Sequence, residues 1–341
     1  MKTVLVTGGA GYIGSHTTLS LLEKGFNVVV VDNLCNSSNE SIDRVQKLTG
    51  KSVDFYEVDL RDSVKLQEIF KQHVISGVIH FAALKAVGES MEFPFSYYQN
   101  NLTSTLNLLE IMQQNDCQNI IFSSSATVYG EEAIPPYQEK MKYGTPSSPY
   151  GASKMMVERI LQDITVASKG LHSVSLRYFN PIGAHESGEI GEDPKNVPQN
   201  LMPFISQVAV GKRAQLNVFG SDFPTDDGTC ERDYLHVMDL AEGHVLALEW
   251  LLKQESLSEM AVFNLGTGTP YSVLQIIQAF ETANNIQVPY VITERRKGDL
   301  PAFWADASKA KTHLGWETKR SLEQMMLDTW RWQMQNPNGF S

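Results

Sequence analysis

The 341-residue sequence has few cysteines, no long apolar run and no cluster of basic residues. Its cysteines, Cys35, Cys117 and Cys230, are far apart and form no CxxC pair, so reduced thiols are expected and no metal site. No window approaches the roughly 20 apolar residues of a transmembrane helix. The amino-terminal MKTVLVTGG lacks the pattern of a secretory signal. These absences predict a cytoplasmic protein without membrane attachment.

The charge balance is acidic, with a net charge of −11 and a pI of about 5.2. Nucleic-acid binding therefore is not expected, because it normally requires a basic surface. An anionic ligand would also be repelled by the molecule as a whole. Helix N-termini and individual arginines would have to hold such a ligand locally.

What is present is an alternation of β-branched runs and helical patterns in the first half of the chain. Strands are expected at 3–7, 27–31, 53–56, 77–80, 119–123 and 173–176. Helices are expected at 12–24, 64–73, 94–114 and 150–167. Apolar strands that alternate with helices predict an α/β fold, a Rossmann-like doubly wound parallel sheet.

The second half differs in texture. Residues 181–235 are rich in proline and glycine, yet apolar and aromatic residues recur, which favours a smaller, loop-rich α/β substrate-binding lobe over a linker. Helices are expected again at 237–252, 272–283 and 322–335, and residues 336–341 are expected to fray. The predicted domains are 1–180, binding a dinucleotide, and 181–341, binding substrate, with part of 235–265 returning to the first domain.

A glycine-rich loop follows the first expected strand and opens the first helix. Gly8, Gly11 and Gly14 are spaced as GxxGxxG, which allows a tight turn and close approach of a pyrophosphate to a helix N-terminus. Asp32 ends the second strand, where a carboxylate accepts hydrogen bonds from the ribose of NAD and repels the 2′-phosphate of NADP. The alternative is a simple glycine turn with a solvated aspartate. Asp59, after the third strand, either reads the adenine edge or is an ordinary loop residue.

Tyr150 and Lys154 lie four residues apart and therefore on one helix face. A phenol has a pKa near 10, but a neighbouring ammonium and a cationic nicotinamide would favour its phenolate, which can accept a substrate proton. Ser125 follows a strand that ends at the expected ligand crevice, so its hydroxyl can share that proton. The alternatives are an incidental helix pair and a turn serine.

A set of motifs carries a family resemblance over nearly the whole chain. VTGGAGYIGSH, DNLCNS, HFAALKAVGES, SSSATVYG, SPYGASK, RYFNPIGAH and GDLPAFWAD together resemble UDP-glucose 4-epimerase, an extended short-chain dehydrogenase/reductase. The resemblance implies tightly bound NAD and reversible C4 epimerisation of UDP-glucose and UDP-galactose through a 4-keto sugar. It also implies a homodimer, with the segments 94–114 and 150–167 as candidates for the interface.

The resemblance further assigns residues to each ligand. Besides the glycines, the catalytic residues Ser125, Tyr150 and Lys154 and the two aspartates, the NAD site would contain Tyr12, Ile13, Asn33, Leu34, Cys35, Asn36, Ser37, Leu60, Phe81, Ala82, Ala83, Lys85, Asn100 and Phe179. The UDP-sugar would contact Lys85, Ser125, Tyr150, Asn180, Asn200, Leu201, Asn217, Phe219, Arg232, Arg296, Asp299 and Phe303. Arg232 and Arg296 would bind the pyrophosphate, although surface solvation or a structural ion pair is the alternative for both.

Three other functions compete with this interpretation. A nucleotide-sugar 4,6-dehydratase would carry Asp-Glu where this chain has Ala126-Thr127. An epimerase for UDP-N-acetylhexosamines would need room beside the sugar, where Phe303 predicts little, unless Phe303 is plain core. A non-catalytic NAD-binding scaffold would not need the Tyr150/Lys154 pair.

Overall fold

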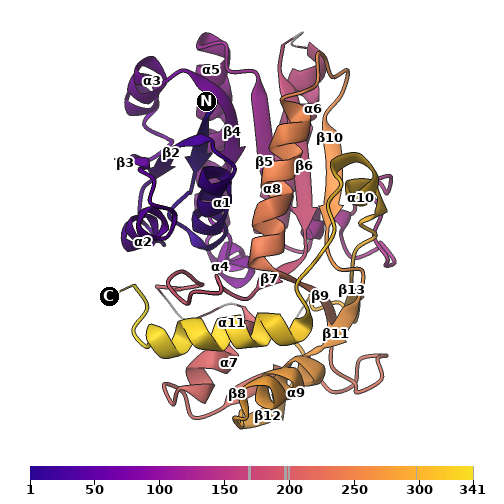
Figure 1. Cartoon of the computed structure of the whole chain (residues 1–341). Helices are drawn as coiled ribbons and strands as arrows, with labels where there is room; N and C mark the ends of the chain where they lie inside the picture. The colour runs from indigo at the N-terminus through magenta and orange to yellow at the C-terminus, as the bar shows by residue number, and fades with distance from the viewer. Residues whose placement is uncertain (168–169, 196–197, 199, 297, 341) are drawn as a thin grey trace.

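The central layer is a seven-stranded parallel sheet in the computed structural model, which describes residues 1–167, 170–195, 198, 200–296 and 298–340 (Figure 1). Its strands are β1 (Thr3–Thr7), β2 (Asn27–Asp32), β3 (Asp54–Glu57), β4 (Ile75–His80), β5 (Asn119–Ser125), β6 (His172–Tyr178) and β10 (Ala261–Leu265). They are ordered β10-β6-β5-β4-β1-β2-β3. The order reverses between β1 and β4, and at such a point the diverging loops of a doubly wound sheet leave a ligand crevice. The predicted fold class is confirmed.

Helices cover both faces of this sheet because its strands are apolar on both sides. One face packs against α1 (Tyr12–Glu23), α2 (Glu40–Thr49) and α8 (Val237–Leu251). The other packs against α3 (Ser63–Gln72), α5 (Pro94–Gln114) and α6 (Pro149–Ala167). Along β1, Val4 and Val6 enter the first core and Leu5 the second, as the two-residue period of a strand requires.

Shorter elements lie around the carboxyl ends of the strands. They include α4 (Val87–Glu92) and the 3-10 turn η1 (Ala126–Tyr129). A second sheet is built on β9 (Glu231–His236), which pairs with β7 (Asn180–Ile182), β11 (Pro270–Ser272) and β13 (Ala302–Phe303). Two further strands, β8 (Leu216–Phe219) and β12 (Tyr290–Thr293), pair in parallel.

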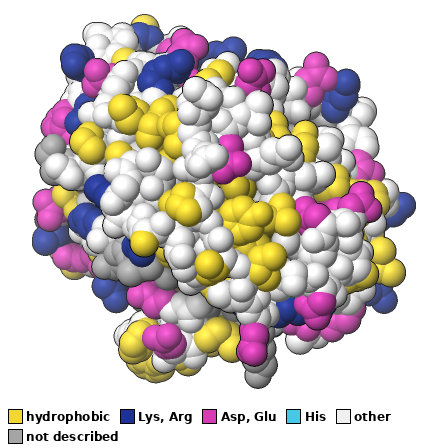
Figure 2. All heavy atoms as spheres, turned by 90° about the horizontal axis from the view of Figure 1, so that it is seen from below, with side chains coloured by type: hydrophobic (Ala, Val, Ile, Leu, Met, Phe, Trp, Pro, Cys, Tyr) yellow, Lys and Arg dark blue, Asp and Glu magenta, His cyan; other side chains and the backbone are white. Residues whose placement is uncertain are grey.

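The lower lobe has its own core. The helices α7 (Leu201–Ala209), α9 (Val273–Asn284) and α11 (Leu322–Gln335) pack there, while α10 (Ser308–Leu314) packs against the large sheet. On the lower face, acidic and basic side chains are interspersed and apolar side chains gather in a few groups (Figure 2). Among the described helices, none has the length and apolar character needed to cross a bilayer.

Although both elements follow the loop-rich segment 181–235, β10 is a strand of the large sheet and α8 packs on a face of that sheet (Figure 1). This arrangement supports our division of the chain near residue 180 with a return at 235–265, which we retain as a proposal. The helix at 201–209 within that segment was not expected. This helix is only nine residues long and has a proline at its third position, so its sequence gives little periodic signal of a helix.

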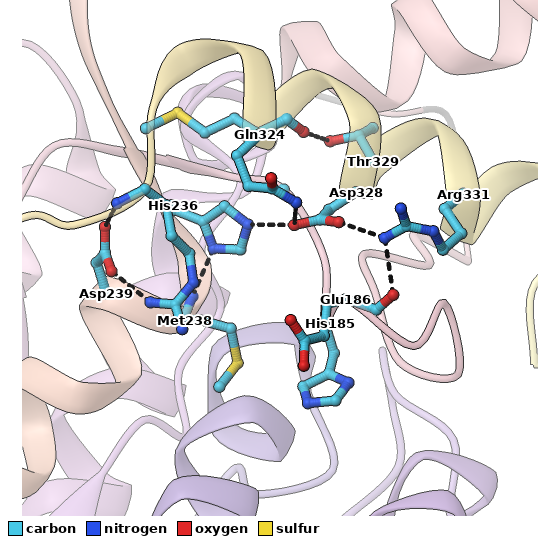
Figure 3. Close-up of polar contacts among 12 residues, drawn as sticks. His185, Glu186, His236, Met238, Asp239, Gln324, Asp328, Thr329 and Arg331 are labelled. Carbon is cyan, nitrogen blue, oxygen red and sulfur yellow. Dashed lines mark hydrogen bonds and ion pairs between the residues drawn. The ribbon is translucent and has the colours of Figure 1, made fainter. Parts of the chain in front are cut away.

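The C-terminal helix α11 is held beneath the large sheet by a buried polar network (Figure 3). Asp328 accepts hydrogen bonds from His236 Nε2 at 3.2 Å and Gln324 Nε2 at 2.8 Å, and it pairs with Arg331. His236 Nδ1 accepts the backbone N–H of Met238, so Nε2 carries the proton that points to Asp328. The network joins α11 to the junction between β9 and α8.

The expectation of a frayed tail is wrong for residues 336–340, while Ser341 lies outside the described residues. The ring of Phe340 packs 4.8 Å from that of Trp332, and Arg44 lies over it at 5.2 Å. The backbone N–H of Phe340 donates to Asp193. An aromatic side chain near a chain end can pack against the fold in this way even though no periodic sequence pattern predicts it.

Candidate active site

One cleft of about 780 Å³ lies at the carboxyl ends of the sheet strands and extends into the lower lobe. This volume lies within the usual range for small-molecule sites. The predicted residues along its wall are Gly8, Gly11, Tyr12, Ile13, Gly14, Asp32, Asn33, Cys35, Asn36, Ser37, Asp59, Leu60, Phe81, Ala82, Ala83, Lys85, Asn100, Ser125, Tyr150, Lys154, Phe179, Asn180, Asn200, Leu201, Asn217, Phe219, Arg232, Arg296, Asp299 and Phe303. The fold thus gathers into one cleft predicted residues from Gly8 to Phe303, which are 295 positions apart in the chain.

Leu34 is the one predicted residue that is not part of the cleft wall. Its side chain packs against the core beneath α1 and α2, and its backbone adopts φ +54°. The Leu34 N–H donates to Asp32 Oδ1 at 2.9 Å. Leu34 therefore shapes the loop that holds Asp32.

The glycine loop has no space for a side chain at Gly8 or Gly14. A Cβ at Gly14 would lie 2.2 Å from the Gly8 carbonyl oxygen, and Gly8 itself adopts φ +70°. The N-cap of α1 is Gly11, which has no side chain to bond the first free N–H groups of the helix. The N-terminus of α1 is thus left open on the cleft, where it suits a pyrophosphate.

Asp32 ends β2 and is almost fully buried. Its carboxylate accepts hydrogen bonds from the Ala10 N–H and the Ser37 hydroxyl, which fix its orientation toward the glycine loop. Asp59 is held differently, because Arg61 binds both of its carboxylate oxygens. The hydrogen bonds from Arg61 lower the pKa of Asp59 well below its usual range. Asp59 lines the cleft, but its oxygens are already engaged.

A second open helix N-terminus lies in the same cleft. Helix α7 begins at Leu201, and the side chain of its N-cap Asn200 does not bond the helix. The Asn200 amide instead donates to Glu192 Oε1 at 2.9 Å, and Lys85 lies 3.5 Å from the same oxygen. The cleft therefore offers two separate positions for phosphate groups, one on each lobe.

Two arginines converge on one acid at the far end of the cleft. Arg296 binds Asp299 through two nitrogens at 2.9 and 3.3 Å, and Arg232 lies 3.7 Å from the same carboxylate. Arg232 also donates to the Leu300 carbonyl, and Arg296 stacks over the ring of Phe219. In the protein alone, the two arginines pair with Asp299 and also line the cleft, so the structure is compatible with either a pyrophosphate site or a structural ion pair.

Tyr150 and Lys154 lie on the first turns of α6 and face the same cleft. The Lys154 Nζ is buried, lies 5.9 Å from the centre of the Tyr150 ring and donates to the Ser123 carbonyl at 2.6 Å. Burial raises the pKa of Tyr150 to about 12 and lowers the pKa of Lys154 to about 7. In the protein alone, therefore, Lys154 does not produce the expected lowering of the Tyr150 pKa.

Ser125 ends β5 and caps η1. Its Oγ accepts the Thr127 N–H at 3.2 Å and the Thr127 hydroxyl at 3.0 Å, so its own proton is free to point elsewhere. The Ser125 hydroxyl counteracts the effect of burial on the pKa of Tyr150. The two hydroxyls are thus coupled, as a shared substrate proton would require.

Sequence reasoning missed several residues of this cleft. Glu192 binds both Lys85 and Asn200, Thr127 orients Ser125, and Phe340 reaches the wall from the chain end. The proline- and glycine-rich context of Glu192 had no strand or helix end to mark it. Thr127 was identifiable, since it follows the strand-end serine by two residues.

Comparisons with known proteins agree on one family. Residues 5–329 match a family model described as GDP-mannose 4,6 dehydratase. A UDP-glucose 4-epimerase of Erwinia amylovora is 56% identical over 339 residues, which cover 99% of this chain and 100% of that protein. The crystal structure of UDP-glucose 4-epimerase from Bifidobacterium longum, in complex with NAD+ and UDP, has a TM-score of 0.96 and 49% identity, covering 99% and 100% of the two chains. One from Stenotrophomonas maltophila, with NAD and formylated UDP-arabinopyranose, has a TM-score of 0.95 and 46% identity, covering 99% of each chain.

The chain belongs to the UDP-glucose 4-epimerase family. The family resemblance predicted from the motifs is confirmed. The full-length relatives place the chain with these epimerases, although the matching family model takes its description from a dehydratase. The roles assigned to individual cleft residues stay predictions.

Proposed function

We propose that this UDP-glucose 4-epimerase interconverts UDP-glucose and UDP-galactose and is thus an isomerase (EC 5.1.3.2). The observation that carries the proposal is the pairing of two hydroxyls, Tyr150 and Ser125, in a cleft that has an open helix N-terminus on each lobe. A dinucleotide and a nucleotide sugar each bring a pyrophosphate to such a terminus. The nucleotide sugar would then place its C4 hydroxyl in the same cleft as Tyr150 and Ser125, which can remove its proton.

The cofactor is NAD, and the residues fit it. A Cβ finds no space at Gly8 or Gly14, α1 is open, and the Asp32 carboxylate is positioned against that loop, where it would repel a 2′-phosphate. When bound, NAD would accept the hydride from C4 of the hexose and later return it to the 4-keto sugar, and its oxidised ring would supply the positive charge that favours a Tyr150 phenolate. Lys154, whose Nζ lies 5.9 Å from the centre of the Tyr150 ring, would hold the nicotinamide ribose.

Tyr150 takes the O4 proton and returns it after the sugar has turned over. Because the Thr127 hydroxyl donates to Ser125 Oγ, the hydroxyl proton of Ser125 points away from Thr127. Ser125 can therefore share the O4 proton of the substrate with Tyr150. Arg232, Arg296 and the N-terminus of α7 hold the UDP moiety, while the hexose has fewer fixed polar partners. Firm binding of UDP and loose binding of the sugar permit hydride return to the opposite face.

A dehydratase would need an acid and a base beside the keto sugar. Here those positions hold Ala126, whose methyl group has no proton to transfer, and Thr127, whose hydroxyl does not ionise near neutral pH and is bonded to Ser125. A UDP-N-acetylhexosamine 4-epimerase is the closer alternative. Phe303 lines the cleft with its ring against Phe179 and leaves little room for an acetamido group, so we expect poor turnover of those substrates.

We further infer a homodimer in the cytoplasm. Large apolar side chains are exposed along α4, α5 and α6, among them Met91, Phe93, Phe95, Leu106 and Met156. Exposed apolar side chains gathered on neighbouring helices favour association. No such association is needed for the cleft itself, which one chain lines.

The test is to incubate purified protein with UDP-galactose alone, without added NAD. Formation of UDP-glucose is expected, because retained NAD is regenerated in each cycle. A scaffold would give no product, and a dehydratase would give a 4-keto-6-deoxy sugar nucleotide. Activity only after addition of NAD would support the reaction but contradict tight retention of the cofactor.

A further inference from the structure

Phe303 is held on three sides by the fold. It lies on β13, in register with Arg232 of β9. Its ring is 5.0 Å from that of Phe179 and 5.0 Å from that of Tyr137. Phe303 and Phe179 both line the cleft, whereas Tyr137 is fully buried behind them. The remaining side of the Phe303 ring faces the ligand space.

Tyr137 meets Phe303 edge to face, at an interplanar angle of 89°. An aromatic ring in this position blocks the space into which Phe303 would have to retreat. Any substrate group larger than the available room must displace both rings.

The backbone of Tyr137 is pinned beside Phe303. Its N–H donates to the Trp304 carbonyl at 2.9 Å, and its carbonyl accepts from the Asp306 N–H at 2.8 Å. Asn264 Nδ2 binds the same carbonyl at 2.8 Å. The loop that carries Tyr137 therefore cannot shift without disturbing the segment that follows β13.

A further ring supports Tyr137 from behind. Tyr129 lies 5.0 Å away, its hydroxyl donates to Asn264 Oδ1 at 2.6 Å, and Arg177 stacks over it at 4.8 Å. Arg177 in turn is held by the buried carboxylate of Glu158. The stack of rings thus ends on a rigid ion pair in the core of the NAD domain.

The hydroxyl of Tyr137 contributes nothing to this support. It is buried and has no hydrogen-bond partner among the described residues, an arrangement that is normally unfavourable. The contribution of Tyr137 at this position therefore comes from the volume of its ring. Phenylalanine would supply that volume without the unpaired hydroxyl, and it is therefore a natural matched control.

We propose that Tyr137 is a positioning residue for substrate selection: its ring holds Phe303 against the hexose space and so excludes a 2-acetamido group. This inference rests on the proposed function, in which Phe303 borders the hexose. Tyr137 touches neither substrate nor cofactor and acts through Phe303 alone.

The experiment compares kcat/KM for UDP-galactose and UDP-N-acetylgalactosamine in Tyr137→Ala, Tyr137→Phe and Phe303→Ala. In Tyr137→Ala we expect kcat/KM for UDP-N-acetylgalactosamine, divided by kcat/KM for UDP-galactose, to rise by about tenfold or more. A change of a few methylenes in a pocket gives an effect of this size. Tyr137→Phe should keep the wild-type ratio. A purely structural role would lower both activities together and leave the ratio unchanged.

The double variant Tyr137→Ala/Phe303→Ala separates this role from others. Its ratio should equal that of Phe303→Ala, because the two residues act on one barrier. An unchanged ratio in folded Tyr137→Ala, together with a raised ratio in Phe303→Ala, overturns the proposal. If Tyr137→Ala does not fold, Tyr137→Leu decides by the same criterion.

Failure of the proposed function gives different results. Wild-type protein that does not convert UDP-galactose removes the reaction itself. An unchanged ratio in Phe303→Ala removes the assumption that Phe303 borders the sugar, and with it the proposal for Tyr137.

Discussion

At the scale of single residues, ionisation is decided by what surrounds a group. Tyr150 and Lys154 are adjacent on one helix face, as their spacing predicts. Burial nevertheless raises the pKa of Tyr150 to about 12 and lowers that of Lys154 to about 7, so both are driven toward their neutral forms. A proton-accepting phenolate therefore requires positive charge that the chain alone does not supply.

Replacing Tyr150 with Phe is expected to reduce kcat by about 10² to 10⁴-fold, the usual contribution of a positioned acid or base. Bound NAD should remain, because the glycine loop and Asp32 are untouched. Turnover of UDP-galactose and the absorbance of released cofactor measure the two effects. Near-normal turnover would remove Tyr150 from the mechanism, and loss of NAD would assign it to cofactor binding instead.

At the scale of elements, α6 positions the catalytic pair through a buried ion pair two turns below Tyr150. Glu158 follows Lys154 by four residues and binds Arg177 of β6 together with the hydroxyls of Ser124 and Ser175. Burial raises the pKa of Glu158, but Arg177 and the two serines outweigh it, and the pKa is lowered overall. The carboxylate thus fixes α6 against β5 and β6.

Glu158→Gln should destabilise the protein by roughly 3 kcal/mol at pH 7, because it leaves Arg177 buried without a counter-charge. The lowered pKa sets the direction of the pH effect. The contribution of Glu158 is present above the unfolded pKa near 4.3 and is lost as the pH falls. Wild-type protein should therefore lose more stability than the variant as the pH falls below about 5, and the difference should grow as the pH continues to fall through the lowered pKa of Glu158.

Thermal or urea unfolding at several pH values measures this difference. Asp163→Asn is the matched control, since Asp163 lies on the same helix and pairs with Arg159 at the exposed surface. That variant should unfold like the wild type at pH 7. Equal stability of Glu158→Gln and Asp163→Asn would contradict the claim that the buried Glu158–Arg177 pair stabilises the fold.

At the scale of the whole molecule, the exposed apolar side chains on α5 lie on the face of the sheet opposite α1 and α8. Phe95 is the most exposed of them, at 76%. A lone chain would leave this surface in water at a cost of about 25 cal/mol per Å² of apolar area. A second copy of the chain would cover it.

Phe95→Glu should convert the proposed homodimer into a monomer, because burial of the charge at the interface is unfavourable. Light scattering after size-exclusion chromatography measures the mass. Val74→Glu, at an even more exposed apolar residue before β4, is the control and should leave the mass unchanged. A monomeric wild type would refute the dimer, and a dimeric Phe95→Glu would place the interface elsewhere.

Much of this protein follows from its sequence. The two-residue and 3.6-residue periods identified β1, α1, α5 and α11 at or near their observed bounds, because these elements bury regular apolar faces. The glycine loop and Asp32 were identifiable for a similar reason, since their roles depend on local backbone geometry. Leu34 was predicted to line the cofactor site, and its partly buried side chain packs against the core, which local sequence does not indicate.

Only the tertiary structure decided the rest. The acidic partner Glu192, the clustering of Arg232 and Arg296 on Asp299, and the stack of Tyr137 behind Phe303 join segments that are distant in the chain. Local periodicity carries no information about such contacts, because they arise where separate loops meet above the strand ends. The pKa values of Tyr150 and Lys154 depend on the same packing: residue type sets which proton can move, and burial sets the pH at which it does.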